Sequence, residues 1–239
     1  MRKFKVVIPA RMASVRLPGK PLMDIQGKPM LIRVAEKCIE SVGPTNVLVS
    51  TPDDEIVKAC NYFNIPVIKS SIQCKTGTDR MVELLNRSDA EYFINIQGDE
   101  PMVPVKVIKS FIDDCLQNDE SCVGYSRIYD NKYIESNSVV KVAVSNSKLI
   151  YASRSKLPVG NDGNEIGFLK HTGLYGFNRE DLENFGKFIK GPLETAENVE
   201  ILRMIENRIP IRAIEVPNFG RAVDSLEDYE FVNKYGEFK

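Results

Sequence analysis

From residue 5 to residue 117, short apolar runs alternate with longer segments in which apolar residues recur every three or four positions. The first apolar run, Lys5 to Ile8, is rich in β-branched residues and is followed at once by Pro9. The segment from Pro29 to Val42 has the helical period and stops at Gly43-Pro44, which is typical of a helix end. Strands that alternate with helices of this length predict βαβ units around a parallel sheet.

This pattern predicts strands at residues 5–8, 46–50, 66–69 and 92–96, and helices at residues 29–42, 53–62, 78–86 and 104–117. Ligands of such sheets bind at the carboxyl ends of the strands. The polar loops that follow Ile8 and Ile96 both begin at such an end. These two loops are therefore the first candidates for a binding site.

The second half of the chain is less regular. Its expected strands are residues 121–129, 139–144, 149–151, 171–177 and 211–216, and its expected helices are residues 194–207 and 225–234. The short spacing of the strands predicts an antiparallel or mixed addition, and no linker, repeat or block of charge divides the sequence. The expected fold class is therefore α/β, with a mostly parallel twisted sheet flanked by helices. We expect one domain over residues 1–239, with a smaller mixed-sheet excursion around residues 125–205.

The charge balance argues against two classes of partner. Lys and Arg total 32, Asp and Glu total 33, and the formal net charge is −1. A neutral chain has no general attraction to nucleic acid or anionic lipid, so any phosphate binding must come from a local cluster of cations. No apolar run approaches the roughly 18 to 20 residues that cross a bilayer. We expect neither a nucleic acid nor a membrane partner.

The N-terminus and the cysteines indicate a cytoplasmic protein. Met1 to Lys5 is basic like the start of a signal peptide, but only Val6, Val7 and Ile8 follow before Pro9, so secretion is not expected. The five cysteines are odd in number and contain no Cys-x-x-Cys pair. With a single histidine, the sequence does not favour a structural zinc site, and the expected state is reduced thiols.

The loop after the first predicted strand carries three cations, Arg11, Arg16 and Lys20. Small residues that would let backbone amides approach a ligand lie among them: Ala10, Ala13, Ser14 and Gly19. Such a loop suits a triphosphate, although a solvated basic loop without a ligand is the alternative at this point. It matches neither the Walker A pattern nor the dinucleotide fingerprint, which argues against a nicotinamide oxidoreductase.

Two aspartates could complete a phosphate site. Asp99 follows the predicted strand at residues 92–96, within Gln97-Gly98-Asp99-Glu100-Pro101, and Asp224 follows Gly220 to Val223. Hard divalent cations bound to phosphates take one or two carboxylates and otherwise keep water. Either aspartate alone could be a turn residue or a helix cap. Only together with the cationic loop do they favour a metal site.

Segments spread over nearly the whole chain resemble, in order, the CMP-Kdo synthetase (3-deoxy-manno-octulosonate cytidylyltransferase) family. The matching segments are residues 9–11 with 16–22, 76–80, 95–101, 153–154 with 157–158, 170–175, 193–203 and 223–228. The first loop and the Asp99 loop are shared more loosely with other cytidylyltransferases, including CMP-sialic acid synthetases. The resemblance implies a fold like that of the nucleotide-diphospho-sugar transferases.

The resemblance also implies a reaction. CTP would bind in the parallel half of the sheet with Mg²⁺, and the anomeric hydroxyl of a 2-keto-3-deoxy sugar acid would attack the α-phosphorus. The products would be the CMP-sugar and pyrophosphate, and the sugar would be Kdo or a modified Kdo for lipopolysaccharide or capsule. The family further implies a homodimer.

Matching positions imply the following site residues. The catalytic residues would be Arg11, Lys20 and Asp99, and the Mg²⁺ ligands would be Asp99 and Asp224. CTP would contact Ala10, Arg11, Arg16, Lys20, Thr76, Gly77, Arg80 and Gln97. The sugar would contact Arg154, His171, Tyr175, Glu200 and Ile201.

Several positions depart from the family pattern, mainly around the sugar residues: Ile201 for a usual glutamine, Ala152 for phenylalanine, Phe177 for tyrosine, Cys74 for histidine and Thr76 for serine. Replacing a buried amide by Ile201 removes a donor and an acceptor that could read a sugar hydroxyl. We therefore expect nucleotidyl transfer to be retained while the identity of the sugar acid is open. The alternatives are an amino variant of Kdo, another ulosonic acid such as a sialic acid, and a non-catalytic relative that binds CTP.

Overall fold

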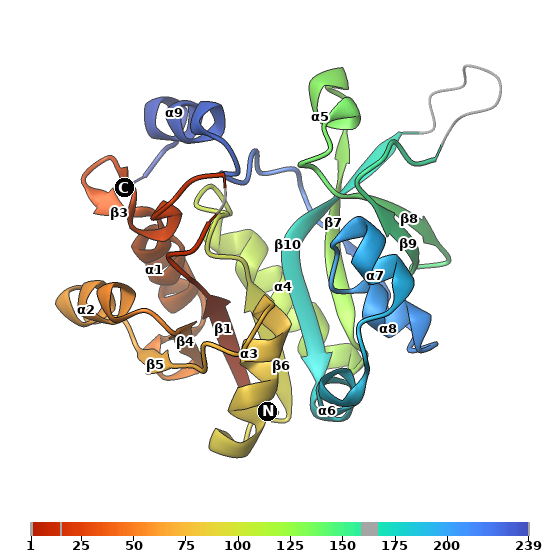
Figure 1. The fold of residues 1–239 in the computed structure, drawn as a ribbon, viewed down its shortest axis with the longest axis horizontal. Coiled ribbons are helices and arrows are strands. Elements are labelled where there is room, and N and C mark those ends of the chain that lie inside the picture. The colour runs from red at the N-terminus through yellow and green to blue at the C-terminus, as the bar shows by residue number, and fades with distance from the viewer. Residues whose placement is uncertain (1, 15, 159–166, 239) are drawn as a thin grey trace.

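The computed structural model describes residues 2–14, 16–158 and 167–238. In that part of the chain, one sheet of nine strands runs through the molecule in the order β5-β4-β1-β6-β10-β7-β11-β9-β8. Helices cover both of its faces (Figure 1). The expected excursion at residues 125–205 includes residues 159–166, which lie outside the described residues.

The first half of the chain forms the predicted βαβ units. The strands are β1 (Phe4–Pro9), β4 (Val47–Thr51), β5 (Val67–Lys69) and β6 (Tyr92–Ile96), and each neighbouring pair is parallel. The helices are α1 (Met30–Val42), α2 (Asp54–Tyr62), α3 (Gly77–Leu84) and α4 (Val105–Asn118). The patterns did not predict the hairpin of β2 (Asp24–Ile25) and β3 (Lys28–Pro29) or the 3-10 turns at residues 20–22, 44–46 and 85–87.

The strands of the second half extend the same sheet. They are β7 (Cys122–Ile128), β8 (Lys141–Ser145), β9 (Lys148–Ser153), β10 (Phe168–Asn178) and β11 (Arg212–Glu215). Strand β10 lies antiparallel between β6 and β7, and the pairings make β9 and β10 run against the direction of the other strands. The expected α/β fold class, with its mixed addition, is confirmed.

The predicted continuous helix at residues 194–207 is wrong. The structure has two short helices there, α7 (Pro192–Glu197) and α8 (Leu202–Glu206). Asn198 takes a left-handed conformation with φ 52°, which asparagine tolerates better than most residues, and this ends α7. The Glu206 carboxylate accepts hydrogen bonds from the amides of Leu193 and Glu194, so α8 folds back on the start of α7.

Three further helices complete the chain: α5 (Asn131–Glu135), α6 (Arg179–Lys187) and α9 (Leu226–Tyr235). Of these, only α9 was predicted. It begins with a capping box in which Ser225 and Asp228 satisfy each other's free backbone amides. Helix α6 has a comparable signal, because the Asn178 side chain accepts from the amide of Asp181.

The sheet separates two hydrophobic clusters. Residues of α1, α2 and α4, such as Leu31, Ile56 and Phe111, pack on one face, and residues of α3 and α6, such as Met81 and Phe185, pack on the other. Because both faces are covered, the central strand β6 is buried at every position, and its residues are apolar except for Asn95. The sheet is therefore a rigid support for the loops at its carboxyl edge.

Replacing Phe93 with Ala should test how much this core contributes. Phe93 lies in β6, is 0% exposed and belongs to the cluster under α3 and α6. Removing a buried phenylalanine typically lowers the free energy of unfolding by about 3–5 kcal/mol, and we expect a loss of that size in urea denaturation. Ile72→Ala is the control, because Ile72 is 84% exposed and should change stability by less than about 0.5 kcal/mol. Equal effects of the two substitutions would contradict this assignment of the core.

Candidate functional site

A cavity of about 780 Å³ opens at the carboxyl edge of the sheet. The loops that follow β1 and β6 line it, as the predicted topology requires. Because β10 runs in the opposite direction, its first half lies at this same edge and adds Lys170 and His171 to the wall. The connection from β11 to α9 brings Asp224 to the cavity from far along the sequence.

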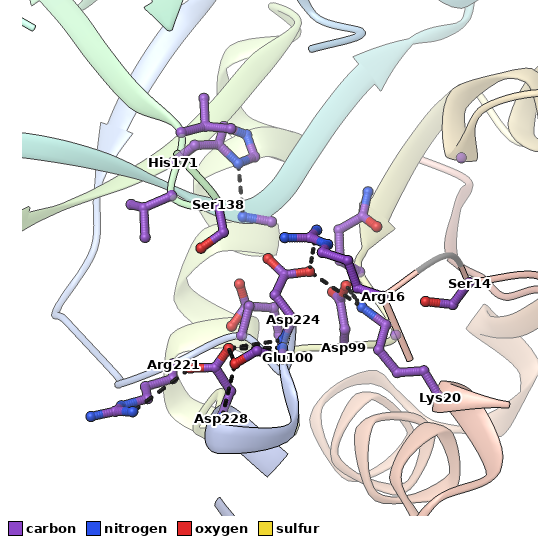
Figure 2. A pocket seen from close by; sticks show the side chains of 18 of the residues that line it. Ser14, Arg16, Lys20, Asp99, Glu100, Ser138, His171, Arg221, Asp224 and Asp228 are labelled. Atoms are coloured by element: carbon purple, nitrogen blue, oxygen red, sulfur yellow. Dashed lines mark hydrogen bonds and ion pairs between the residues drawn. The ribbon is translucent and has the colours of Figure 1, made fainter. Parts of the chain in front are cut away.

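The centre of the cavity is a cation held between two carboxylates (Figure 2). The Lys20 ammonium donates to Asp99 Oδ2 at 2.7 Å and to Asp224 Oδ1 at 3.5 Å. It also donates to the carbonyl of Val223 at 2.9 Å. All three charged side chains are between 15% and 25% exposed, so water can only partly screen them. Asp99 and Asp224 thus point at one position, although 125 residues separate them in the sequence.

Electrostatic coupling follows from this packing. Burial would lower the pKa of Lys20, but the carboxylates of Asp99 and Asp224 outweigh it and raise that pKa. Burial, followed by repulsion from Asp99, raises the pKa of Asp224. Two carboxylates this close repel each other, so the site favours a cation between them.

The two arginines of the first loop lie on the same wall as Lys20. Arg16 donates to Asp224 Oδ1 at 2.9 Å, and Arg11 reaches the carbonyl of Lys75 at 3.4 Å. Ala10 also lines the cavity. The loop is anchored by the Met12 amide, which donates to Asp53 Oδ2 at 2.7 Å. The cations predicted from the sequence therefore converge on one cavity instead of pointing separately into solvent.

The N-terminus of α3 forms the floor at one end of the cavity. The Thr76 side chain accepts from the Asp79 amide, and Asp79 accepts from the Thr76 amide, so a capping box fixes the first turn. A Cβ atom on Gly77 would stand 3.0 Å from Pro9 Cγ and 3.2 Å from Asn95 Nδ2, so only glycine lets α3 approach β1 this closely. Arg80 and Gln97 line the same end, and Arg80 donates to the carbonyl of Cys74.

The opposite wall is built around a bulge in β10. The register of β10 shifts between His171 and Tyr175, and Gly173 takes a φ of 70°. A Cβ there would lie 3.1 Å from Glu100 Cγ, so glycine allows β10 to close against the loop that carries Asp99. The Gly173 amide donates to His171 Nδ1, and the Gly173 carbonyl accepts from the Gln97 amide. The bulge therefore aims His171 into the cavity and links it to the Asp99 loop.

His171 is held as a neutral imidazole. Burial lowers its pKa from 6.5 to about 4. With Nδ1 accepting from Gly173, the ring proton of the neutral form lies on Nε2, which is buried and has no hydrogen-bond partner among the described residues. The ring lies 4.4 Å from that of Tyr175, whose pKa burial raises. At neutral pH, His171 can therefore donate one hydrogen bond to a ligand through Nε2. The imidazole carries no positive charge at that pH.

The single histidine makes this state directly measurable. In an NMR titration of the chain without a tag, we expect the imidazole signal to titrate near pH 4 and to stay constant from pH 5.5 to 8. The unfolded chain takes up a proton near pH 6.5, so between pH 6.5 and 4 it binds more protons than the folded chain. The free energy of unfolding should therefore fall as the pH is lowered through this range, and His171→Gln should remove that part of the fall. Titration near 6.5 in the folded chain would contradict the buried imidazole.

Arg154 and Glu200 line the cavity but are partly engaged by the protein itself. The Arg154 guanidinium donates to the carbonyls of Asn137, Ser138, Glu197 and Asn198. Glu200 Oε2 accepts from the amide of Thr78 in α3 at 2.9 Å, which leaves its other oxygen for a ligand. Both side chains thus help to shape the wall as well as to line it.

Ile201 does not lie on the cavity wall, and its placement as a sugar contact is wrong. It is 1% exposed and belongs to the hydrophobic cluster beneath α3 and α6. Ala152 and Phe177, the other two departures that we expected beside the sugar, are buried in the same cluster. These three changes therefore alter the packing behind the wall and remove no hydrogen-bonding group from it. Every other predicted site residue lines the cavity.

Sequence patterns missed the roles of three charged residues in this region, of which Glu100 and Lys141 are buried and Lys170 is half-buried. Glu100 is 6% exposed, and burial raises its pKa. Burial lowers the pKa of Lys170, and the charge of each group partly offsets the pKa shift of the other. Lys141 is 0% exposed, and its ammonium donates to the carbonyls of Ser136, Val139 and Arg154. Lys141 thereby holds the segment that overhangs the cavity at residues 136–140. A lysine within an otherwise apolar strand is the only sequence signal for this role.

The two aspartates suit a magnesium ion that also binds phosphate. Mg²⁺ is usually held by one or two carboxylates together with substrate phosphates and water. Asp99 and Asp224 already converge on one cation, the Lys20 ammonium. Within the described ranges, no group of three or more His, Cys, Asp or Glu side chains could hold a metal ion. In the same ranges, no helix combines the length and apolar character needed to span a membrane.

Comparisons with known proteins identify the family of this chain. A family model described as cytidylyltransferase matches residues 5–211. The 3-deoxy-manno-octulosonate cytidylyltransferase of Escherichia coli is 35% identical over 228 residues, which cover 94% of this chain and 92% of the relative. The enzyme of the same name from Myxococcus xanthus is 39% identical over 230 residues, which cover 95% of this chain and 93% of the relative.

Two solved structures are similar to this chain, one in sequence and fold and the other in fold alone. A CMP:2-keto-3-deoxy-manno-octonic acid synthetase complexed with CTP superposes with a TM-score of 0.89 at 34% identity, and the match covers 97% of both chains. A putative glucose-1-phosphate thymidylyltransferase from Bacillus anthracis shares the fold, with a TM-score of 0.70 at 12% identity over 99% of this chain and 97% of that one.

Proposed function

The chain belongs to the cytidylyltransferase family and is a CTP-dependent nucleotidyltransferase, and we propose that it transfers CMP from CTP to the anomeric hydroxyl of Kdo. The proposed reaction requires Mg²⁺ and releases pyrophosphate. The single observation that carries the proposal is the convergence of Asp99, Asp224 and Lys20 in a cavity lined by two further loop arginines. That arrangement offers separate groups for a metal ion and for a triphosphate.

The residues divide into two sets by charge. Asp99 and Asp224 would hold Mg²⁺, which when bound would neutralise phosphate charge. Lys20, Arg11 and Arg16 would bind the triphosphate oxygens, because cationic donors form strong hydrogen bonds with phosphate. Phosphoryl transfer of this kind depends mainly on positioning and on stabilisation of developing charge, with little covalent chemistry from the protein. A fixed cluster of cations on a rigid sheet edge meets that need.

The base and the sugar would occupy opposite ends of the cavity. We propose that Thr76, Gly77, Arg80 and Gln97 contact cytidine, because they form the end at the start of α3. Arg154, His171, Tyr175 and Glu200 would contact the sugar acid. His171 would act as a neutral donor through Nε2, and Arg154 would add positive charge for the sugar carboxylate. The attacking hydroxyl would then lie between this wall and the Lys20 centre.

The location of the departures favours Kdo over another ulosonic acid. Ala152, Phe177 and Ile201 lie in the core. The polar residues proposed for the sugar, Arg154, His171, Tyr175 and Glu200, line the cavity and match the resemblance. A hydrophobic change behind the wall alters shape slightly, whereas loss of a buried hydrogen-bonding group would change discrimination much more. Retention of Lys20, Asp99 and Asp224 in contact argues against a relative that only binds CTP.

The decisive experiment measures pyrophosphate release with CTP, Mg²⁺ and a panel of sugar acids. We expect release with Kdo that stops when CTP, the metal or the acid is omitted. The panel includes amino-Kdo and a sialic acid. If either acid gives faster release than Kdo, that acid and not Kdo is the substrate. CTP binding in a calorimeter without turnover on any acid would indicate a non-catalytic relative. The homodimer implied by the resemblance stays a prediction, which light scattering of the purified chain tests.

A further inference from the structure

A buried polar cluster lies directly behind the cavity, around Arg203 of α8. Its guanidinium donates to both oxygens of Glu194, at 2.7 and 2.8 Å, in the fork geometry that arginine forms with a carboxylate. The third nitrogen, Nη1, lies 3.5 Å from Asp79 Oδ1. The guanidinium carbon is 4.0 Å from the centre of the Phe185 ring. Four elements, α3, α6, α7 and α8, therefore meet at this one side chain.

The cluster is well shielded from solvent. The side chain of Arg203 is 9% exposed and that of Glu194 is 2% exposed. Taking two charges out of water costs free energy that their attraction regains only when the geometry is good. An apolar contact of similar volume would often stabilise a fold as well, so stability alone does not explain a charged pair here. Its contacts to three other helices suit it to fix the geometry of those elements.

The two acidic partners of Arg203 connect it to different parts of the cavity wall. Asp79 closes the capping box with Thr76, which fixes the first turn of α3 at the end proposed for cytidine. Glu194 lines the cavity from α7. The turn between α7 and α8 carries Glu200, whose carboxylate accepts from the Thr78 amide. Two polar bridges, Arg203 to Asp79 and Glu200 to Thr78, therefore tie the proposed sugar side to the proposed nucleotide side.

We propose that Arg203 is a positioning residue that sets the start of α3 and the Glu200 turn relative to each other, so that the binding of both substrates depends on it. This inference rests on the proposed function for the identity of the two ligands. Arg203 lies behind the wall and is not among the described residues that line the cavity. Its effect on binding must therefore pass through Asp79, Glu194 and the elements that carry them.

The start of α3 is sensitive to small displacements. Gly77 packs so closely on Pro9 that even a Cβ atom would meet the proline ring at 3.0 Å. A shift of α3 away from the sheet would carry Thr76 and Gly77 from any base bound there. Loss of the Arg203 bridges should therefore weaken nucleotide binding without removing a contact.

The test is Arg203→Lys, which keeps the charge but cannot bond both Glu194 oxygens and reach Asp79 at once. We expect the Kd for CTP, measured by calorimetry without sugar, to rise about tenfold, and the KM for Kdo to rise by a similar factor, with a smaller change in kcat. Arg212→Lys is the matched control. Arg212 is also ion-paired, in this case with Asp114, and its side chain is 15% exposed. It lies at the start of β11, at the end of the sheet away from the cavity. Its Kd for CTP should stay within twofold of the wild-type value.

Asp79→Asn separates positioning from general damage if Arg203→Lys folds poorly. The asparagine oxygen can still accept from Thr76, while the attraction to Arg203 is lost, so the Kd for CTP should again rise. Unchanged CTP affinity in both Asp79→Asn and folded Arg203→Lys would overturn the proposal, and so would equal weakening by Arg212→Lys. Failure of the wild-type chain to release pyrophosphate would instead count against the proposed function, since the CTP affinities do not require turnover.

Discussion

Replacing Lys20 with Met is expected to lower the rate of pyrophosphate release by about 10²–10³-fold, the range seen when one preorganised donor to a developing charge is removed. The Lys20 ammonium lies 2.7 Å from Asp99 and 3.5 Å from Asp224, at the centre of the cavity. Methionine has a similar length and fills the same space, so the change removes the charge and leaves the packing largely intact. Steady-state release with saturating CTP and Kdo measures the effect.

The same substitution should act in the opposite direction on cation binding. In the structure, Lys20 supplies the positive charge that keeps Asp99 and Asp224 together. Without it, the two carboxylates repel each other, and among the described residues the ion pair that is left is that of Arg16 with Asp224. We therefore expect Lys20→Met to bind Mn²⁺ more tightly than the wild-type chain when CTP is absent, as measured by electron paramagnetic resonance. Loss of activity together with gain of cation affinity would distinguish this role from simple unfolding.

Lys132→Met provides the comparison for Lys20→Met. Lys132 also lines the cavity, but it pairs with Glu227 and its side chain is 56% exposed. Exposed ion pairs contribute little, so we expect release within about threefold of wild type. Lys20→Arg should retain part of the activity, because the charge remains while the compact ammonium is replaced by a planar group. Full activity in Lys20→Met would remove Lys20 from the proposed mechanism.

The parallel half of the sheet could be predicted because its signals are local. Each strand is a short β-branched run, and each helix has its own period and stop signal, so Lys5 to Ile8 and Pro29 to Val42 appear within about two residues of β1 and α1. The meeting of the Lys20 and Asp99 loops then follows from the shared carboxyl edge of β1 and β6. Asp224 is different. No local pattern brings it there: it was a candidate only in combination with Asp99 and the cationic loop, and the resemblance then implied its role as a metal ligand.

The features that escaped prediction depend on contacts between distant residues. Nothing in the sequence of β10 states that it enters the sheet between β6 and β7 in the opposite direction, because pairing depends on which edges are free when the strands meet. The break at Asn198 depends on Glu206 folding back to cap α7. Ile201 follows Glu200 directly, yet the two side chains diverge at this turn, one to the cavity and one to the core. A matching motif gives residue positions but not the direction of each side chain.

Substitution of either aspartate, Asp99 or Asp224, is the other change expected to lower the rate of pyrophosphate release strongly. Asp99→Asn and Asp224→Asn each remove one of the two carboxylates proposed for Mg²⁺, and an amide oxygen is a weaker ligand without charge. We expect each to lower pyrophosphate release by about 10²–10³-fold, which is the scale of losing a main electrostatic stabiliser of the transferred phosphoryl group. The Mg²⁺ concentration that gives half-maximal rate should rise in both. Titration of the rate against Mg²⁺ measures the two quantities together.

The double substitution decides whether the two carboxylates act as one site. If Asp99 and Asp224 hold the same cation, the loss of rate in the double variant should be far smaller than the product of the losses in the two single variants. Groups that act as a unit do not have additive effects on the activation free energy. Glu227→Gln is the control, since Glu227 lines the same cavity but pairs with Lys132 and is 63% exposed. It should leave both the rate and the Mg²⁺ requirement within about twofold of wild type. Fully multiplicative losses in the double variant would mean that the aspartates act on separate steps, and the shared cation site would have to be abandoned.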